Sequence, residues 1–225
     1  MHVETIGDGD PKLAVVGAVH GDEPSGAAAV ERLLADPPEL RRPVKLVVAN
    51  ERALDRGVRS VDEDLNRAFP GDPDADTHEG RLAAALTDEL AETTTLALHA
   101  TRSHPEPFAV VDGVDEFARA VVPRLSVVAA VDAADRVEGR LFVADGVLEV
   151  ETGRQGTPEA ADNAERLDRE FLAATGALPD PRDPRRVPVY ELGEPIPKAA
   201  RADDDEGTTN DVPEDDEGTT NDVPE

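Results

Sequence analysis

Residues 15–23 read V-V-G-A-V-H-G-D-E, an apolar run that ends in charged and metal-ligating side chains. The run shows no polar alternation, which is typical of a strand covered on both faces in a largely parallel sheet. Residues 24–34 follow with Pro and Ser at their start and with many Ala, Val and Leu residues, as expected for a helix. This order of strand, tight turn and helix predicts an α/β fold with His20 and Glu23 in the turn.

Segments of the same two kinds alternate along the rest of the chain. Apolar runs predict strands at 44–49, 95–98, 108–111 and 125–131 and two short strands within 141–150, and Ala- or Leu-rich segments predict helices at 24–35, 78–92, 114–122 and 157–175. The alternation predicts a three-layer α/β/α sandwich around a mixed, largely parallel sheet. Ligands in such folds bind at the carboxyl ends of the strands.

Histidine follows two of the predicted strands. His20 ends the first apolar run, and His99 follows the run T-L-A-L at 95–98. A histidine and a carboxylate three residues apart, such as His20 and Glu23, can face one ion, and two histidines with one glutamate form a known catalytic zinc set. A single H-x-x-E is more often a structural turn, but a second histidine at a second strand end favours a metal site. His104 precedes a proline and is not expected to be a ligand.

The composition excludes several classes of function. The chain has 225 residues, no cysteine and a net charge of −27. Without cysteine there is neither a disulfide framework nor a thiolate metal site or nucleophile. Nucleic acids and anionic membranes bind basic surfaces, so the charge argues against both as partners. Neither an apolar run of about 18 residues nor a signal-peptide pattern occurs, so we expect a cytoplasmic location.

The excess of acidic residues is not confined to the C-terminal segment. The segment from Asp203 onward holds 11 acidic and no basic residues, which leaves 39 acids against 23 bases and a charge of −16 in the rest. Lysine occurs only three times, and aromatic residues make up 3% of the chain. This composition predicts a protein from a halophilic archaeon. At molar salt the Debye length is about 3 Å, so the self-repulsion of such a surface is screened.

A long polar loop is expected at 51–76, and long loops in compact domains are usually functional. It contains R-S-V-D-E-D-L-N-R-A-F-P-G from Arg59 to residue 71. Arginine pairs bidentately with carboxylates and stays charged, so Arg59 and Arg67 suit an anionic ligand. The alternative is that these arginines pair with the acids at 62–64 on the surface, where ion pairs stabilise little.

Two further residues are placed near the predicted metal site. Arg102 lies in the loop after His99, and Glu151 follows the run V-L-E-V and precedes Thr-Gly. A glutamate at this strand end could take a proton from water at the metal. The alternative is that Glu151 caps the turn or pairs with Arg154. We predict Arg102 as a substrate-binding residue.

Four motifs together resemble one family. H-G-D-E stands at 20–23, D-L-N-R-x-F at 64–69 with Arg59 upstream, L-H at 98–99 and E-x-G at 151–153. Their order and spacing are similar to those of the succinylglutamate desuccinylase/aspartoacylase family, relatives of the zinc carboxypeptidases. The resemblance covers residues 13–196 and implies a zinc carboxypeptidase-like fold and hydrolysis of the amide bond of an N-acyl amino acid.

The resemblance implies a role for each matching residue. One Zn²⁺ per chain would be held by His20, Glu23 and His99. Glu151 would be the general base that activates water and later protonates the leaving amine, and Arg59 would polarise the amide carbonyl and stabilise the oxyanion. Asn66 and Arg67 would hold a carboxylate of a small acylated amino acid substrate.

The sequence departs from the family pattern in three places. Ala97 stands where many members have Asp two residues before the histidine, which removes a carboxylate that could support the ligand. Glu51 stands where Pro is common. Family members continue past a V-Y-E-like segment, here 189–191, into a β-rich domain that covers the site, and here an acidic segment follows instead.

The end of the chain repeats one acidic unit. D-D-E-G-T-T-N-D-V-P-E occurs twice in succession between 204 and 225 and cannot bury a core. We therefore expect a catalytic domain at 1–200, with the start of a truncated β segment near 187–197, and a disordered tail at 201–225.

Other functions remain open beside a zinc-dependent amidohydrolase. A carboxypeptidase-like peptidase would need room for a longer substrate, which an uncovered site allows. In an inactive zinc-binding protein that acts as a binding module, Glu151 and Arg59 would point away from the metal. A regulatory protein would act through its acidic tail. A homo-oligomer, in which a partner subunit completes the site, also remains open.

Overall fold

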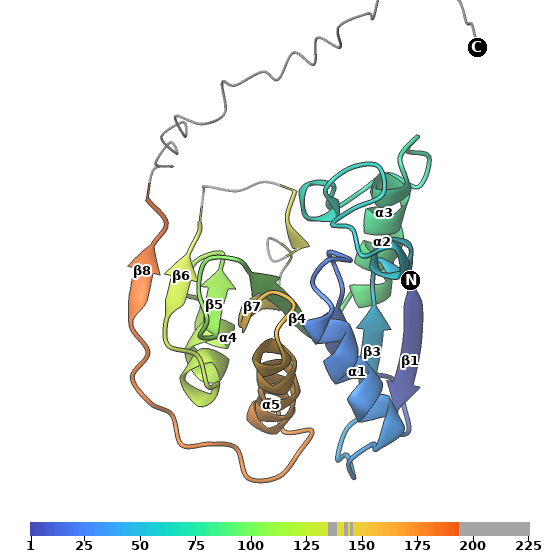
Figure 1. Cartoon of the computed structure of the whole chain (residues 1–225). Coiled ribbons are helices and arrows are strands. Elements are labelled where there is room, and N and C mark those ends of the chain that lie inside the picture. The colour runs from blue at the N-terminus through green and yellow to red at the C-terminus, as the bar shows by residue number, and fades with distance from the viewer. Residues whose placement is uncertain (135–138, 142–143, 145, 194–225) are drawn as a thin grey trace, which may run out of the picture. The chain divides into compact units, whose positions relative to one another are not determined.

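The apolar run after Lys12 forms strand β2 (Leu13–Gly17), which lies inside the sheet with every residue buried. The computed structural model describes residues 1–134, 139–141, 144 and 146–193. Met1–Leu192 form one unit (Figure 1). The tail predicted at 201–225 and the end of the predicted catalytic domain beyond residue 193 lie outside the described residues.

Eight strands form one mixed sheet in the described part of the chain. From one edge to the other they are β1 (His2–Ile6), β3 (Val44–Val48), β2, β4 (Thr94–Thr101), β7 (Val147–Arg154), β5 (Phe108–Val111), β6 (Ala130–Asp132) and β8 (Val189–Glu191). The pairs β1–β3 and β7–β5 are antiparallel, and the other pairs are parallel. The neighbouring strands β3, β2, β4 and β7 therefore share one carboxyl edge.

Alternate residues of β2 enter two different hydrophobic cores. The helices are α1 (Ser25–Ala35), α2 (Glu51–Arg56), α3 (His78–Leu90), α4 (Glu116–Val121) and α5 (Pro158–Ala174), with short turns η1 (Leu65–Arg67) and η2 (Val122–Arg124). Leu13 and Val15 belong to the core that contains α1 and α5, which lie side by side (Figure 1). Ala14 and Val16 belong to the core that contains α3. The two cores confirm the predicted α/β/α layers.

The sequence does not predict two elements near the start of the chain. β1 is largely exposed, so no apolar run marks it. α2 occupies the beginning of the polar loop predicted at 51–76. Asn50 caps this helix by accepting a hydrogen bond of 3.2 Å from the backbone N–H of Ala53, and Gly57 ends it with a φ of 62°. Ala53 is its one buried residue, so caps rather than an apolar face define the helix.

The strand predicted at 125–131 is shorter in the structure. β6 begins at Ala130, while Leu125 and Val127 are buried without belonging to a strand. The Arg185 guanidinium donates hydrogen bonds to both of their carbonyl oxygens, at 3.1 Å for Leu125. A side chain thus replaces a neighbouring strand, which apolar patterning cannot reveal. The first run predicted within 141–150 falls partly outside the described residues, and the second forms the start of β7.

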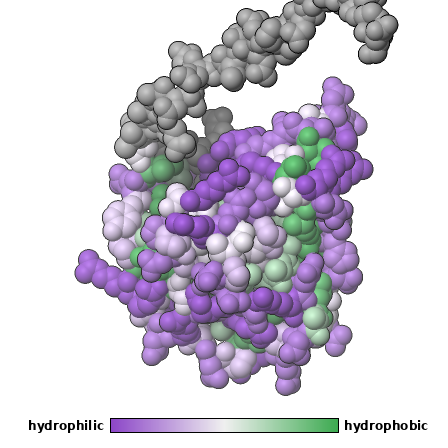
Figure 2. All heavy atoms as spheres, in the orientation of Figure 1, coloured by the Kyte–Doolittle hydropathy of each residue, from purple (hydrophilic) through white to green (hydrophobic). Residues whose placement is uncertain are grey.

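Hydrophilic side chains dominate the face that Figure 2 shows. The exposed large apolar side chains of the described residues are Met1, Val58, Val128, Val189, Tyr190 and Leu192. Within the same residues, none of the helices has the length and apolar character needed to cross a membrane. The two cores therefore take up nearly all the large apolar side chains of the described part.

Candidate active site

The turn after β2 carries two of the predicted ligands. Ala18 has a φ of 53°, in the left-handed region, and turns the chain out of the strand before His20. Gly21 packs closely on α2, because a Cβ atom there would lie 2.0 Å from the backbone carbonyl carbon of Ala53. The backbone N–H of Glu23 donates to the His20 carbonyl oxygen at 3.2 Å. Both side chains therefore leave one tight turn.

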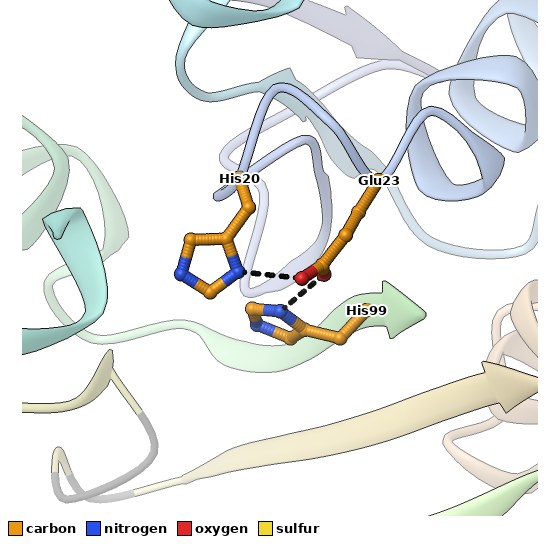
Figure 3. Close-up of side chains that lie close together, drawn as sticks. All are labelled: His20, Glu23 and His99. Atoms are coloured by element: carbon orange, nitrogen blue, oxygen red, sulfur yellow. Dashed lines mark hydrogen bonds and ion pairs between the residues drawn. The ribbon is translucent and has the colours of Figure 1, made fainter. Parts of the chain in front are cut away.

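His99 reaches the same point from β4. The strand continues to Thr101, so His99 lies inside it and not at its end as predicted. His20 Nδ1 is 2.9 Å from Glu23 Oε1, and His99 Nδ1 is 3.0 Å from Glu23 Oε2 (Figure 3). All three side chains are buried. The structure brings together the three residues that the sequence predicts as metal ligands.

These three side chains can hold one metal ion. One ligand atom from each lies within 4.8 Å of the other two. A tetrahedral zinc ion with bonds of about 2.0–2.2 Å needs ligand atoms about 3.4 Å apart, so small side-chain shifts suffice. Burial raises the pKa of Glu23, but hydrogen bonds with His20 and His99 outweigh it and hold that pKa far below its ordinary value. Glu23 therefore offers an anionic carboxylate between two imidazoles.

A second carboxylate lies behind His20. Asp64 Oδ1 is 2.9 Å from His20 Nε2, and Asp64 Oδ2 accepts hydrogen bonds from Nε and Nη2 of Arg59 at 3.2 and 3.0 Å. The hydrogen bond with His20 is the main cause that lowers the pKa of Asp64. Arg59 also donates from Nη1 to Glu23 at 3.2 Å. Arg59 thus pairs with a local acid and at the same time lies beside a predicted metal ligand.

Buried Glu79 of α3 holds the loop that presents Arg59 and Asp64. Its carboxylate accepts hydrogen bonds from the backbone N–H groups of residues 61–63, at 2.7, 2.9 and 3.3 Å, and from the Asn50 amide at 3.0 Å. Burial alone raises the pKa of Glu79, but these bonds lower it. The loop is therefore fixed to a helix. The sequence does not single out Glu79, because a glutamate in the first turn of a helix is common.

All eight predicted site residues line one cavity of about 400 Å³. They are His20, Glu23, Arg59, Asn66, Arg67, His99, Arg102 and Glu151. The cavity is also lined by polar residues that the sequence does not single out, namely Asp22, Thr101, Arg140, Glu149 and Gln155. His104 is not among the lining residues, and its Nδ1 accepts a hydrogen bond from the backbone N–H of Glu106 at 3.1 Å. His104 therefore lies outside the lining of this cavity.

Glu151 lies beside the histidines on the neighbouring strand. In the parallel pairing of β4 and β7 its Cα is the partner of His99, and β7 continues past it to Arg154. Gly153 allows this continuation, because it has a φ of 121° and a Cβ there would lie 2.6 Å from the Pro105 carbonyl oxygen. Glu151 Oε2 is buried without a hydrogen-bond partner among the described residues, and burial raises the pKa of this carboxyl group. Such a carboxylate is suited to accept a proton.

Three arginines line the cavity besides Arg59. Arg102 is largely exposed and donates to Gln155 Oε1 at 3.0 Å and to Asp22 Oδ2 at 3.3 Å, so it lies at the rim. Arg67 donates to the Asn66 carbonyl oxygen at 2.6 Å. Burial is the main cause that lowers the pKa of Arg140, and the charge of Arg67 is the second. Two like charges close together favour an anionic ligand between them.

Asn66 is engaged within the protein at both ends of its amide. Nδ2 donates to Glu149 Oε1 at 3.0 Å, and Oδ1 accepts from the backbone N–H of Leu141 at 2.8 Å. One N–H of the amide group is left for a ligand in the cavity. Glu149 is 4% exposed and lies on the same strand as Glu151. The sequence signal that could have identified Glu149 is the alternation V-L-E-V-E, because alternate residues of a strand share a face and Glu149 therefore projects to the same side of β7 as Glu151.

The three-layer α/β fold thus brings a His-Glu-His set, a buried carboxylate and several arginines together at one edge of the sheet. Residues 9–104 match the model of the family described as "Succinylglutamate desuccinylase/Aspartoacylase catalytic domain". Over these residues the match agrees with the family resemblance that the motifs predict.

Curated relatives match short segments of the chain. An N-acyl-aromatic-L-amino acid amidohydrolase (carboxylate-forming) from Xenopus laevis is 44% identical over 61 residues, which are 26% of this chain and 20% of that protein. Its namesake from Xenopus tropicalis is 36% identical over 84 residues, 33% of this chain and 27% of that protein. The matched parts therefore span about a quarter of these relatives or less.

Solved structures share the fold over most of the chain. The product-bound ectoine utilization protein EutE (DoeB) from Ruegeria pomeroyi has a TM-score of 0.72 at 20% identity, covering 85% of this chain and 66% of that one. A succinylglutamate desuccinylase from Silicibacter sp. TM1040 has a TM-score of 0.70 at 22% identity, covering 86% and 65%. This likeness confirms the fold class, and the chain spans just under two thirds of both structures.

Proposed function

We propose that the protein is a zinc-dependent hydrolase that cleaves the amide bond of an N-acyl amino acid into a carboxylate and a free amine. The observation that carries the proposal is that Glu151 and Arg59 line the same cavity as His20, Glu23 and His99. A binding module without activity has no need of a base and a cation at these places. The names of the relatives, which are amidohydrolases of N-acyl amino acids, support the same reaction.

Each residue of the site has a separate role in the proposed reaction. His20, Glu23 and His99 would hold the zinc ion, which would supply Lewis acidity and make water at the site easier to deprotonate. Glu151 accepts a proton from the attacking water and passes it to the nitrogen as the carbon–nitrogen bond breaks. Arg59 donates toward the carbonyl oxygen, which becomes negative as the water adds.

The lining of the cavity favours a charged substrate. Arg67 and Arg140 offer two guanidinium groups for carboxylates, and Arg102 adds a third at the rim. No aromatic or large aliphatic side chain of the described residues lines this cavity, apart from the two histidines. A pocket for an aromatic amino acid is normally apolar. We therefore place an acidic or polar N-acyl amino acid ahead of an aromatic one for this chain.

The composition supports a habitat of high salt. The chain has a net charge of −27, and hydrophilic side chains dominate the face that Figure 2 shows. Salt screens the repulsion among such charges. A positive group of arginines around the metal site can then attract an anionic substrate into an acidic protein. Halophilic origin, cytoplasmic location and assembly into a homo-oligomer remain predictions.

Metal analysis combined with an amine-release assay tests the proposed function. Purified protein, the variants His20→Ala and His99→Ala, and the control His104→Ala are loaded with zinc, desalted and measured by mass spectrometry. The substrates are N-acetylaspartate, N-succinylglutamate, N-acetylphenylalanine and a short peptide. About one zinc per chain, lost in both ligand variants and kept in His104→Ala, with amine release from an acidic substrate, is expected. Zinc binding without turnover of any substrate would favour an inactive zinc-binding module. Cleavage of the peptide would favour a carboxypeptidase-like peptidase.

A further inference from the structure

Glu149 is a buried carboxylate to which the proposed reaction assigns no task. It is 4% exposed and lies in the middle of β7, between the core residues Leu148 and Val150. A carboxylate in such a place is costly unless it is paired. The groups that pair with Glu149 therefore show what this carboxylate can act on.

The partner of Glu149 on the metal side is His99. Glu149 Oε1 lies 3.4 Å from His99 Nε2, an ion-pair contact that falls short of a well-formed hydrogen bond. The opposite ring nitrogen, Nδ1, faces Glu23 at 3.0 Å. The His99 ring thus lies between a carboxylate on the metal side and a carboxylate behind it. Asn66 Nδ2 donates to the same Glu149 oxygen at 3.0 Å and holds it in place.

The strand register explains why Glu149 can reach His99. In the parallel pairing of β4 and β7, Ala97 is the partner of Glu149 and His99 is the partner of Glu151. Alternate residues of a strand share a face, so Ala97, His99, Glu149 and Glu151 all project to one side of the sheet. The small side chain of Ala97 provides no carboxylate on β4 itself. The neighbouring strand supplies one in the adjacent position.

The other predicted histidine ligand has the same kind of support. His20 presents Nδ1 to Glu23 at 2.9 Å and Nε2 to Asp64 at 2.9 Å. Each of the two imidazoles therefore has Glu23 at Nδ1 and a second carboxylate at Nε2. In metal sites a carboxylate behind a histidine fixes the tautomer and the orientation of the ring and strengthens the ligand.

We propose that Glu149 is a positioning residue for the metal site, which accepts the Nε2–H of His99 and directs Nδ1 of that ring toward the ion. Asn66 holds the Glu149 carboxylate in turn, so that a residue of the D-L-N-R motif acts on the metal through Glu149. The inference rests on the proposed function only in that it requires zinc at His20, Glu23 and His99.

The zinc affinity of matched variants tests this role without measuring turnover. Glu149→Gln keeps the shape of the side chain and removes its charge. Glu151→Gln is the matched control, because it makes the same change two residues along, on the same face of the same strand. Zinc dissociation constants are measured by competition with a chelator, after circular dichroism and melting have shown that both variants fold. We expect zinc affinity to fall about 10- to 100-fold in Glu149→Gln and to stay within about threefold of wild type in Glu151→Gln.

A spectroscopic measurement reports on the contact itself. In the zinc-loaded wild type, the Nε2–H proton of His99 should give a downfield and slowly exchanging NMR signal, since it is buried against an anion. In Glu149→Gln this signal should move upfield and exchange faster, and in Glu151→Gln it should stay in place. A general effect of lost negative charge on the site would change both variants alike.

The outcomes separate this inference from the proposed function. Wild-type affinity and an unchanged His99 signal in Glu149→Gln would overturn the role of Glu149 while the zinc site stands. Equal loss of affinity in both variants would also overturn it, because charge and not position would then be the cause. No zinc binding by the wild type would overturn the metal site and with it both proposals.

Discussion

Glu151 and His99 are direct partners in the parallel pairing of β4 and β7, so the candidate base and a candidate zinc ligand project from neighbouring strands to one face of the sheet. The backbone of two strands fixes their spacing. A site built on strands holds its groups more precisely than one built on loops. The roles of the surrounding residues can therefore be tested one at a time.

Replacing Glu151 by Gln should strongly lower turnover without removing the metal. Glutamine keeps the size of the side chain but cannot accept a proton, and general-base catalysis contributes about 10²–10⁴-fold. We expect kcat to fall by that factor and zinc content to stay at the wild-type value. A variant that loses less than about tenfold would mean that another group takes the proton.

Replacing Arg59 by Ala should lower kcat by about 10²–10³-fold, the effect of removing one donor to a developing oxyanion. Arg59→Lys should recover little, because Arg59 uses three nitrogens at once to contact Asp64 and Glu23, and an ammonium group lacks this fork. Arg56→Ala, at the exposed end of α2, is the control. The measurement is steady-state kinetics with the best N-acyl amino acid, and an effect on KM alone would contradict the assigned role.

Replacing Arg67 or Arg140 by Ala should weaken binding of an acidic substrate. A hydrogen bond to a charged group contributes about 1.5–3 kcal/mol, so KM should rise roughly 10- to 100-fold with a smaller change in kcat. A substrate in which the carboxylate is replaced by a primary amide should show little difference between wild type and variants. Equal losses with both substrates would mean that these arginines stabilise the cavity and do not bind the carboxylate.

The sequence predicts the three layers, the three side chains that meet at the candidate metal site and the loop that carries Arg59, because each leaves a local signal. Buried strands leave apolar runs, and the site residues stand in motifs with recognisable spacing. The contribution of Glu149 depends on the register of β7 with β4, and no local pattern specifies that register. Arg140 joins the cavity from a segment without apolar periodicity. Asn66 has its place in the motif, but its contact with Glu149 lies 83 positions along the chain.

Salt should raise both stability and turnover. With a net charge of −27, repulsion destabilises the folded chain in dilute buffer, and at molar salt the Debye length falls to about 3 Å. We expect the urea midpoint and kcat/KM to increase between dilute buffer and molar KCl. A rate that is the same at both salt concentrations would contradict the halophilic part of the interpretation.

Asp168 should make stability fall as pH rises. It lies in α5 with no exposed surface, and both carboxylate oxygens lack a hydrogen-bond partner among the described residues. Burial raises its pKa from 3.8 to about 8, against smaller opposing effects of Arg169 and Arg32, and Glu165 adds to the increase. Between these two values the unfolded chain has lost the proton that the folded chain keeps. Stability from this group is therefore fully present below pH 3.8 and is lost as the pH rises to about 8.

Asp168→Asn removes this dependence, because asparagine is neutral at every pH. The variant should be more stable than wild type by roughly 5 kcal/mol at pH 8, and by less than about 2 kcal/mol at pH 5. Urea unfolding at both pH values in molar salt measures it. Asp162→Asn is the control on the same helix, since Asp162 is largely exposed and pairs with Arg32 at the surface. A gain that is equal at the two pH values would show that Asp168 is already ionised in the folded protein. An equal gain in the control would show that the loss of any negative charge on this helix stabilises the protein.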